Sequence, residues 1–411
     1  MFDKKYIIPA DALKLILDAV PGVLSSESIR IEECLGRITA SDIYSIEDLP
    51  GFARSAVDGY AVKASDTYGA RETLPAYIKV KDEVFMGLQP LFEVGAGEAA
   101  RIPTGGMMPS GTDAVIMIEH AQIVSDSEIE VLRPAAFGEN VIQPDEDIKK
   151  GAIVLGRGQK LRPQDLGALA GLGILEAEVV RKPLVSIIST GDEIVPHGSS
   201  VEPGQVRDIN SFTLAGLISE EGGLAVKKGI FRDGFDTIKR ALDSAAADSD
   251  IVLIIGGTSV GVRDMTADII NDSGYGGVLF HGVALKPGKP LIAGIVNDRP
   301  VFGLPGHPAA VVICFDTFVR PIISKMLGID NSRTFRRFLN ARMSKGVASA
   351  AGRQDHVRVH IETEDSGGYT AVPVMGKSGL ITTLVRADGV VVIPRNKLGL
   401  DAGEDVTVNL F

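Results

Sequence analysis

The sequence contains no tryptophan and only two cysteines, Cys34 and Cys314. Because these cysteines are far apart and have no metal-ligand spacing, we expect packed, reduced thiols rather than a disulfide framework. No stretch approaches the ~20 apolar residues of a membrane-spanning helix. The N-terminal residues 1–5 carry no apolar signal-peptide region. These absences predict a cytoplasmic protein without a membrane partner.

Positive charge is also scarce, since 42 Lys and Arg stand against 53 Asp and Glu, a net charge of −11. A net acidic chain repels the phosphate backbone, which argues against sequence-independent binding of nucleic acid but allows a local basic pocket. The six histidines are scattered, and only His356 and His360 lie close together. The valines between these two indicate a strand face, so no structural zinc site is expected.

The 411 residues are too many for one hydrophobic core and predict two to four domains. Residues 10–20 and 163–170 have helical periodicity, whereas short strand-like runs such as 76–80 alternate with Gly and Pro between them. We therefore expect a discontinuous N-terminal domain of residues 1–46 and 143–182. A β-rich inserted domain of residues 47–142 would interrupt it.

Strand-like and helix-like segments alternate from Pro183 onward. This alternation predicts an α/β domain of residues 183–327, built on a doubly wound, mostly parallel sheet. From about residue 331, alternating apolar residues separated by Gly turns indicate strands. We expect residues 328–411 to form a β-rich C-terminal domain. The fold class is thus α/β and multidomain.

A glycine-rich loop follows the buried strand expected at residues 251–255. Its sequence is GGTSVG, residues 256–261. Glycine lets backbone amides approach oxygen atoms closely, and consecutive amides form an anion-binding concavity. Lys286 and Lys289 stand in a loop stiffened by Pro and Gly and supply positive charge. The pattern predicts a site for a phosphorylated or oxyanionic ligand at the end of a parallel strand.

Four acidic residues follow predicted strands or their loops: Asp192, Glu193, Asp233 and Asp264. In an open α/β sheet, ligands bind beyond the carboxyl ends of the strands. Carboxylates gathered there repel one another, and a hard cation, Mg²⁺ before a transition metal, would relieve the repulsion. Any one of them could instead cap a helix or be solvated on the surface. Four such acids beside a glycine-rich loop favour the cation site.

Two loops in the first half of the chain are dense in turn-forming residues. Residues 50–61 carry Asp58, and residues 102–106 carry Thr104. By composition alone both are ordinary turns. Nothing in their residues places them near the α/β site.

The motifs taken together are specific. They are SAVDGYA (55–61), TGG (104–106), STGDE (189–193), GGTSVG (256–261), KPGKP (286–290), LPG (304–306), SG (378–379) and ADG (387–389). In this order, and over essentially the whole chain, they resemble the MoeA family of molybdopterin molybdenumtransferases. The E domain of gephyrin belongs to the same family.

The resemblance implies that the chain binds adenylylated molybdopterin, inserts molybdate at the dithiolene and hydrolyses the adenylyl phosphoanhydride with the help of Mg²⁺. The products would be molybdenum cofactor and AMP. It also implies an elongated homodimer of four-domain chains, with a site shared between protomers. An upstream adenylyltransferase is a further partner that the resemblance allows.

The resemblance also assigns roles to residues. The implied catalytic residues are Asp58, Thr104, Glu193, Asp233 and Asp264, of which Glu193, Asp233 and Asp264 would contact the metal. The residues implied to bind molybdate or the pterin phosphate are Gly256, Gly257, Ser259, Lys286, Lys289, Arg353 and Ser378. Lysine and arginine suit a tetrahedral dianion that needs charge and several donors.

The sequence departs from the family at three places. Residues 142–144 (IQP) stand where many relatives carry arginines, so a phosphate contact there is not expected. Gly282 replaces a common basic residue. His307 replaces a common Asn, and we expect it to pack within its loop rather than act in catalysis.

Three alternatives remain open. The chain could adenylylate molybdopterin, as single-domain relatives do, although its additional domains argue against this. It could insert tungstate, an oxyanion of nearly the same size and charge. It could also be a non-catalytic dimeric scaffold like the gephyrin E domain, although it has no long linker or appended enzyme domain.

Overall fold

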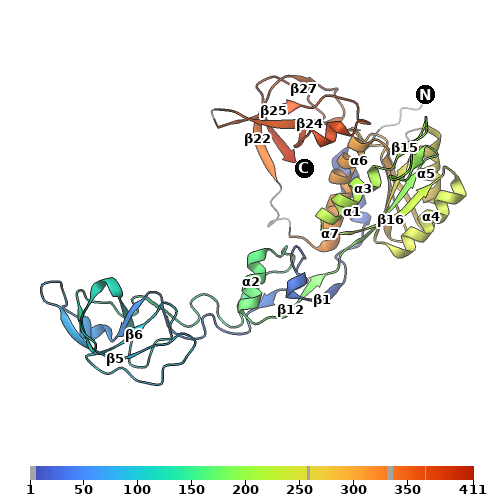
Figure 1. The fold of residues 1–411 in the computed structure, drawn as a ribbon. Coiled ribbons are helices and arrows are strands. Elements are labelled where there is room, and N and C mark those ends of the chain that lie inside the picture. Colours follow the sequence, from blue (N-terminus) through green and yellow to red (C-terminus); the bar gives the residue numbers. More distant parts are fainter. Residues whose placement is uncertain (1–5, 257–259, 331–336, 366) are drawn as a thin grey trace. The chain divides into compact units, whose positions relative to one another are not determined.

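The computed structural model describes residues 6–256, 260–330, 337–365 and 367–411, except the side chains of residues 260–264. The chain divides into two compact units (Figure 1). The β-rich unit comprises residues 42–156 and 163–177. The main unit comprises residues 1–41, 157–162 and 178–411.

The β-rich unit is built on a six-stranded sheet in the order β7-β4-β6-β5-β9-β8. Its strands are β4 (Gly59–Val62), β5 (Ala76–Glu83), β6 (Glu98–Ile102), β7 (Ala114–Met117), β8 (Ala121–Ser125) and β9 (Glu128–Val131). Tyr60, Ile78 and Ile116 pack in its core. Gly59 is required in β4, because a Cβ there would lie 1.9 Å from the carbonyl oxygen of Ile116.

Shorter elements complete this unit. The pair β2 (Ile43–Tyr44) and β11 (Ile153–Leu155) is antiparallel, as is the pair β3 (Arg54–Ser55) and β10 (Val141–Ile142). The helix α2 (Pro163–Gly171) also belongs to it. The β-rich character predicted for residues 47–142 is therefore observed.

A six-stranded sheet in the order β16-β13-β17-β21-β20-β18 organises the main unit. The strands are β13 (Leu184–Thr190), β16 (Leu224–Phe231), β17 (Ile251–Gly256), β18 (Gly276–His281), β20 (Ile292–Val296) and β21 (Arg299–Pro305). The first four in spatial order are parallel, whereas β20 is antiparallel to both its neighbours. This confirms the mostly parallel sheet.

Helices cover both faces of this sheet (Figure 1). On one face lie α4 (Phe235–Asp248) and α5 (Val260–Asp272), and on the other α1 (Pro9–Ala19), α3 (Asn210–Glu220), α6 (Pro308–Cys314) and α7 (Arg320–Leu327). Successive residues of β17 alternate between the two cores: Leu253 packs on the α3 side, and Val252 and Ile254 on the α4 side. A strand buried on both faces is apolar throughout, which is why residues 251–255 form an unbroken apolar run.

The C-terminal strands form a barrel-like sheet in the order β19-β24-β25-β22-β28-β26, which a further pairing of β24 with β26 closes. Its strands are β19 (Leu285–Lys286), β22 (Phe338–Met343), β24 (Gln354–Thr363), β25 (Tyr369–Pro373), β26 (Gly389–Ile393) and β28 (Asp405–Leu410). Because β19 belongs to the chain between β18 and β20, it joins the barrel to the parallel sheet.

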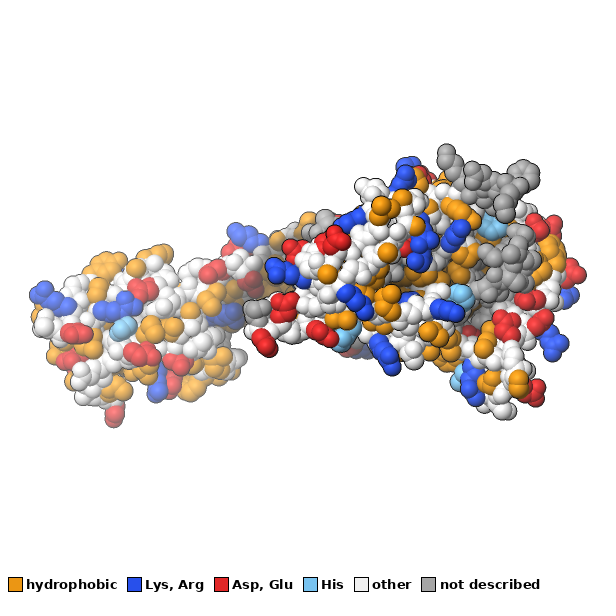
Figure 2. All heavy atoms as spheres, turned by 90° about the horizontal axis from the view of Figure 1, so that it is seen from above, with side chains coloured by type: hydrophobic (Ala, Val, Ile, Leu, Met, Phe, Trp, Pro, Cys, Tyr) orange, Lys and Arg blue, Asp and Glu red, His pale blue; other side chains and the backbone are white. Residues whose placement is uncertain are grey.

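Both cysteines are free and buried, as predicted. Among the described residues, none of the helices has the length and apolar character needed to cross a membrane. On the face that Figure 2 shows, Lys and Arg side chains are interspersed with Asp and Glu side chains.

Candidate functional site

The register of the parallel sheet brings distant loops to one edge. The strands β16, β13, β17 and β21 end side by side, so the segments that follow them are neighbours. The strand β18 is antiparallel to β20, and β20 to β21, so the connection from β18 to β20 lies at this edge too. In spatial order the edge therefore carries Asp233, Asp192 with Glu193, Gly256, His307 and the lysine loop.

Three carboxylates lie together at the β16–β13 end of this edge. The backbone N–H of Asp233 donates to Oδ1 of Asp192 at 3.3 Å. Burial, followed by repulsion from Asp192 and Glu193, raises the pKa of Asp233. Gly191 leaves room for the nearby Glu193 carboxylate, since a Cβ there would lie 2.7 Å from Oε2.

Oδ1 of Asp233 is enclosed and has no hydrogen-bond partner among the described residues. An unpaired, enclosed carboxylate oxygen beside two further carboxylates fits the oxygen ligands that Mg²⁺ prefers. No group of three or more His, Cys, Asp or Glu in the described part of the chain could hold a metal ion by itself. The side chain of Asp264 lies outside the described residues. Metal binding by Glu193, Asp233 and Asp264 stays a prediction.

The glycine-rich loop is described only at its start. Gly256 ends β17, and a Cβ there would lie 3.0 Å from Oγ1 of Thr190. Gly257 and Ser259 lie outside the described residues. Their predicted contacts with an oxyanion stay predictions.

Two predicted oxyanion-binding residues meet around one carboxylate. The parallel pairing of β19 with β24 places Lys286 beside Asp355. Nζ of Lys286 lies 3.4 Å from Oδ2 of Asp355, and Nε of Arg353 lies 2.8 Å from Oδ1. Asp355 was not among the residues predicted from the sequence. Arg353 directly precedes β24, and an acid two residues after that arginine was the signal that could have found it.

The second lysine of the loop has an aromatic neighbour. Nζ of Lys289 lies 4.2 Å from the ring centroid of Tyr6, within cation–π distance. Gly288, between the two lysines, has a φ of +119°. A Cβ at Gly288 would lie 2.8 Å from Sγ of the buried Cys314.

The predicted Ser378 lies against the loop that follows β21. Its hydroxyl is 2.9 Å from Nδ1 of His307, and its carbonyl oxygen accepts the N–H of Ala309 at 3.2 Å. Nδ2 of Asn210 donates to the carbonyl oxygen of Gly306 at 2.8 Å and fixes the same loop. Ser378 therefore reaches the carboxyl edge of the sheet.

Asp58 and Thr104 come together within the β-rich unit. Oδ1 of Asp58 accepts the backbone N–H of Thr104 at 2.7 Å and its hydroxyl at 2.9 Å. The backbone hydrogen bond, followed by the hydroxyl, lowers the pKa of Asp58. Both residues are exposed, so the ionised carboxylate can meet a ligand.

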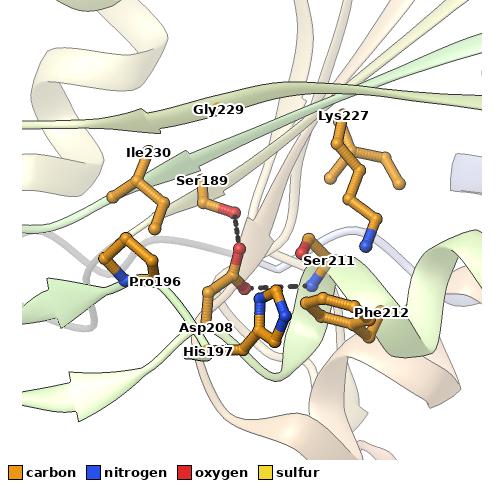
Figure 3. A pocket seen from close by; sticks show the side chains of 10 residues that line it. Ser189, Pro196, His197, Asp208, Ser211, Phe212, Lys227, Gly229 and Ile230 are labelled. Atoms are coloured by element: carbon orange, nitrogen blue, oxygen red, sulfur yellow. Dashed lines mark hydrogen bonds between the residues drawn. The ribbon is translucent and has the colours of Figure 1, made fainter. Parts of the chain in front are cut away.

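A cavity of about 190 Å³ lies beside β13 and β16 on the α3 side of the sheet (Figure 3). The Ser189 hydroxyl donates to Oδ2 of Asp208 at 2.9 Å. Nζ of Lys227 lies 3.1 Å from the ring centroid of Phe212, and the His197 ring meets this ring edge-on. Among the described residues, none of the predicted oxyanion-binding side chains lines this cavity.

Comparison with known proteins gives matches along the chain. Residues 7–173 match the MoeA N-terminal region (domain I and II). Residues 186–325 match a "Probable molybdopterin binding domain", and residues 340–411 match the MoeA C-terminal region (domain IV).

Individual relatives match over nearly the full length. A relative in Methanocaldococcus jannaschii, named "Putative molybdopterin biosynthesis protein", is 36% identical, covering 94% of this chain and 92% of the relative. A molybdopterin molybdenumtransferase of Haemophilus influenzae is 33% identical, covering 96% of each. The crystal structure of a molybdopterin biosynthesis MoeA protein from Pyrococcus horikoshii superposes with a TM-score of 0.84 at 39% identity, covering 99% of both chains.

Proposed function

The chain belongs to the MoeA family of molybdopterin molybdenumtransferases, and from this premise we propose that it inserts molybdate into adenylylated molybdopterin. Insertion is accompanied by Mg²⁺-assisted hydrolysis of the adenylyl phosphoanhydride, which gives molybdenum cofactor and AMP. The reaction takes place in the cytoplasm.

The observation that supports this proposal most is the order of charges along one sheet edge. Asp192, Glu193 and Asp233 lie at one end, and Lys286 with Arg353 at the other. Neighbouring strands are about 4.8 Å apart, so the three steps from β13 to β20 correspond to about 14 Å. A ligand that contacts both ends is elongated and needs a cation near one end and an anion site near the other. Adenylylated molybdopterin with molybdate has this character.

Different residues along this edge bind the cation and the molybdate. Glu193 and Asp233 would hold the cation, and Oδ1 of Asp233 has no hydrogen-bond partner among the described residues. A bound Mg²⁺ would neutralise charge that develops on the phosphoanhydride oxygens. Lys286 and Arg353 bind the molybdate dianion with charge-assisted hydrogen bonds. Ser378, held at the edge by His307, adds a hydroxyl donor or acceptor.

The direct test is incubation of the protein with adenylylated molybdopterin, molybdate and Mg²⁺. We expect AMP release that depends on molybdate and Mg²⁺, together with cofactor that reconstitutes a cofactor-free molybdoenzyme. If neither AMP nor active cofactor forms, the proposal is wrong. Formation of adenylylated product from MgATP and molybdopterin would instead reveal an adenylyltransferase, and tungstate in place of molybdate tests the choice of oxyanion.

A pair of variants makes this test specific. Glu193→Gln removes a proposed cation ligand and is expected to slow AMP release by more than about tenfold. Replacing even a residue that only hydrogen-bonds to a metal ligand typically lowers activity by about tenfold or more. Glu202→Gln makes the same chemical change at an exposed position nearby and should leave the rate unchanged.

The proposal includes a homodimer in which Asp58 and Thr104 of one protomer serve the site of the other, as the family resemblance implies. Sedimentation equilibrium tests the dimer. Mixing and refolding an Asp58→Asn chain with a Lys286→Ala chain tests the sharing, because only a hybrid dimer would hold one intact site. Activity no higher than that of either variant alone would contradict the sharing.

A further inference from the structure

Asp355 stands at the centre of a three-residue charge cluster. Its side chain is only 6% exposed, whereas those of Lys286 and Arg353 are 56% and 38% exposed. Arg353 approaches side-on, with Nε 2.8 Å from Oδ1 and Nη2 3.3 Å from Oδ2. Lys286 reaches Oδ2 from β19 at 3.4 Å. The two cations therefore come from two segments and are brought together by one buried carboxylate.

The cluster keeps unused charge and unused donors. A buried carboxylate is tolerated only when it is paired, and Asp355 is paired twice. Two cations and one anion leave a net positive charge. Arg353 uses Nε and Nη2 for Asp355, so that among the described residues Nη1 keeps its donors, and Lys286 commits one of three N–H groups. Free donors on two fixed, half-exposed cations suit an oxyanion.

We propose that Asp355 is a positioning residue, which holds Lys286 and Arg353 side by side so that both cations meet one oxyanion at fixed spacing. The inference rests on the proposed function, in which that oxyanion is molybdate. Because Asp355 already holds the two long side chains in place, binding of the oxyanion does not have to restrict their rotamers. The conformational entropy lost on binding is therefore smaller. Asp355 acts through its neighbours and does not touch the ligand.

The main unit contains a matched cluster at the opposite edge of the sheet. Asp250 is 5% exposed, and Arg181 and Arg299 lie 2.7 and 3.5 Å from its oxygens. It precedes β17, so it lies at the amino ends of the parallel strands, where ligands are not bound. Its carboxylate also accepts the N–H of Leu184 at 2.8 Å, which ties it to the fold. Asp250 thus provides a structural control.

The test measures molybdate binding directly, by isothermal titration calorimetry on the full chain. Asp355→Asn is expected to weaken molybdate binding by about tenfold, through loss of the fixed geometry. Arg353→Lys keeps the charge but cannot pair side-on, and we expect a similar loss of about tenfold. Asp250→Asn should lower the melting temperature and leave molybdate binding unchanged.

A double-variant cycle separates positioning from simple charge. Lys286→Ala should cost about tenfold in the wild-type background but less than about threefold in the Asp355→Asn background, because coupled residues are not additive. The inference is overturned if Asp355→Asn or Arg353→Lys binds molybdate at least as tightly as the wild type, or if the losses simply add. If the wild-type protein binds no molybdate, it is the proposed function that fails, and this inference fails with it.

Discussion

Thr104 donates both its backbone N–H and its side-chain hydroxyl to a single carboxylate oxygen of Asp58, at 2.7 and 2.9 Å. The two residues are 46 positions apart and belong to separate turns. Both hydrogen bonds favour the ionised carboxylate, which is why the pKa of Asp58 is lowered. The pair therefore presents a fixed negative charge on the surface of the β-rich unit.

Removing the Thr104 hydroxyl should shift the acid limb of the pH–activity profile to higher pH. Thr104→Val keeps the backbone N–H and the side-chain shape but loses one hydrogen bond, so the pKa of Asp58 rises toward its usual value. Because Asp58 is charged only above its pKa, activity should then be lost at a higher pH as the pH falls. The measurement is kcat/KM for AMP release against pH.

Thr112→Val is the control for this change. The Thr112 hydroxyl donates to the carbonyl oxygen of Pro109, in another turn of the same unit. The acid limb of the pH–activity profile of Thr112→Val should coincide with that of the wild type. A Thr104→Val profile that coincides as well would show that the ionisation of Asp58 does not limit the reaction.

Mg²⁺ should stabilise the protein through Asp233. A carboxyl whose pKa is raised in the folded state costs stability as the pH rises from its unfolded to its folded pKa, and a bound cation offsets that cost. At about 100 times its Kd, Mg²⁺ should add about 2.7 kcal/mol to the free energy of unfolding. The effect should fade as the pH falls and Asp233 takes up a proton. Thermal unfolding with and without Mg²⁺ measures it.

Asp233→Asn should remove most of this stabilisation. Asp236→Asn, an exposed acid in the first turn of α4, should retain it. Equal responses of the two variants to Mg²⁺ would place the cation elsewhere.

The elements were predictable where a local pattern specifies them. The apolar run at 251–255 marks a doubly buried strand, and Pro308 begins α6 at a first helical position. The antiparallel turn between β20 and β21 also had a local signal. Asn297 and Asp298 both adopt positive φ, at +50° and +64°, as two-residue hairpin turns require.

The site was less predictable, because its contacts depend on register between distant segments. Lys286 and Asp355 are 69 residues apart, and only the pairing of β19 with β24 makes them neighbours. No periodicity within either segment encodes that pairing. Likewise, the turns around Asp58 and Thr104 look ordinary by composition, and only the family resemblance singled them out.

His356 should make stability depend on pH. Burial lowers the pKa of His356 to about 4, and its Nε2 lies 2.8 Å from the amide nitrogen of Gln354, which donates to a neutral imidazole. Between its usual pKa of 6.5 and this value, the unfolded chain binds a proton that the native chain does not. As the pH is lowered through this window, the free energy of unfolding should therefore decrease, by up to about 1.4 kcal/mol per pH unit.

Urea unfolding from about pH 7 down to about pH 5 measures this slope. His356→Gln cannot take up the proton and should show a shallower slope. If the variant and the wild type lose stability in parallel, another group accounts for the loss.

Gly288 should tolerate no side chain. Its φ of +119° disfavours other residues, and a Cβ would lie 2.8 Å from Sγ of Cys314 and 3.0 Å from Cδ2 of Leu285. Cys314 is fully buried and cannot move aside. Gly288→Ala should therefore displace the lysine loop, weaken molybdate binding and reduce the free energy of unfolding by about 1–3 kcal/mol beyond the backbone strain.

Two further variants separate the steric contact with Cys314 from the backbone strain at positive φ. Gly403 has a φ of +79°, and a Cβ added there would have no described atom within 4 Å, so Gly403→Ala carries the strain alone, about 1–2 kcal/mol. Adding Cys314→Ala to Gly288→Ala removes the sulfur and should restore part of the molybdate binding, although the cavity costs stability of its own. Calorimetric titration and urea unfolding of the four proteins measure both effects. If Gly288→Ala behaves like Gly403→Ala, the packing of Cys314 beneath the lysine loop does not control the site.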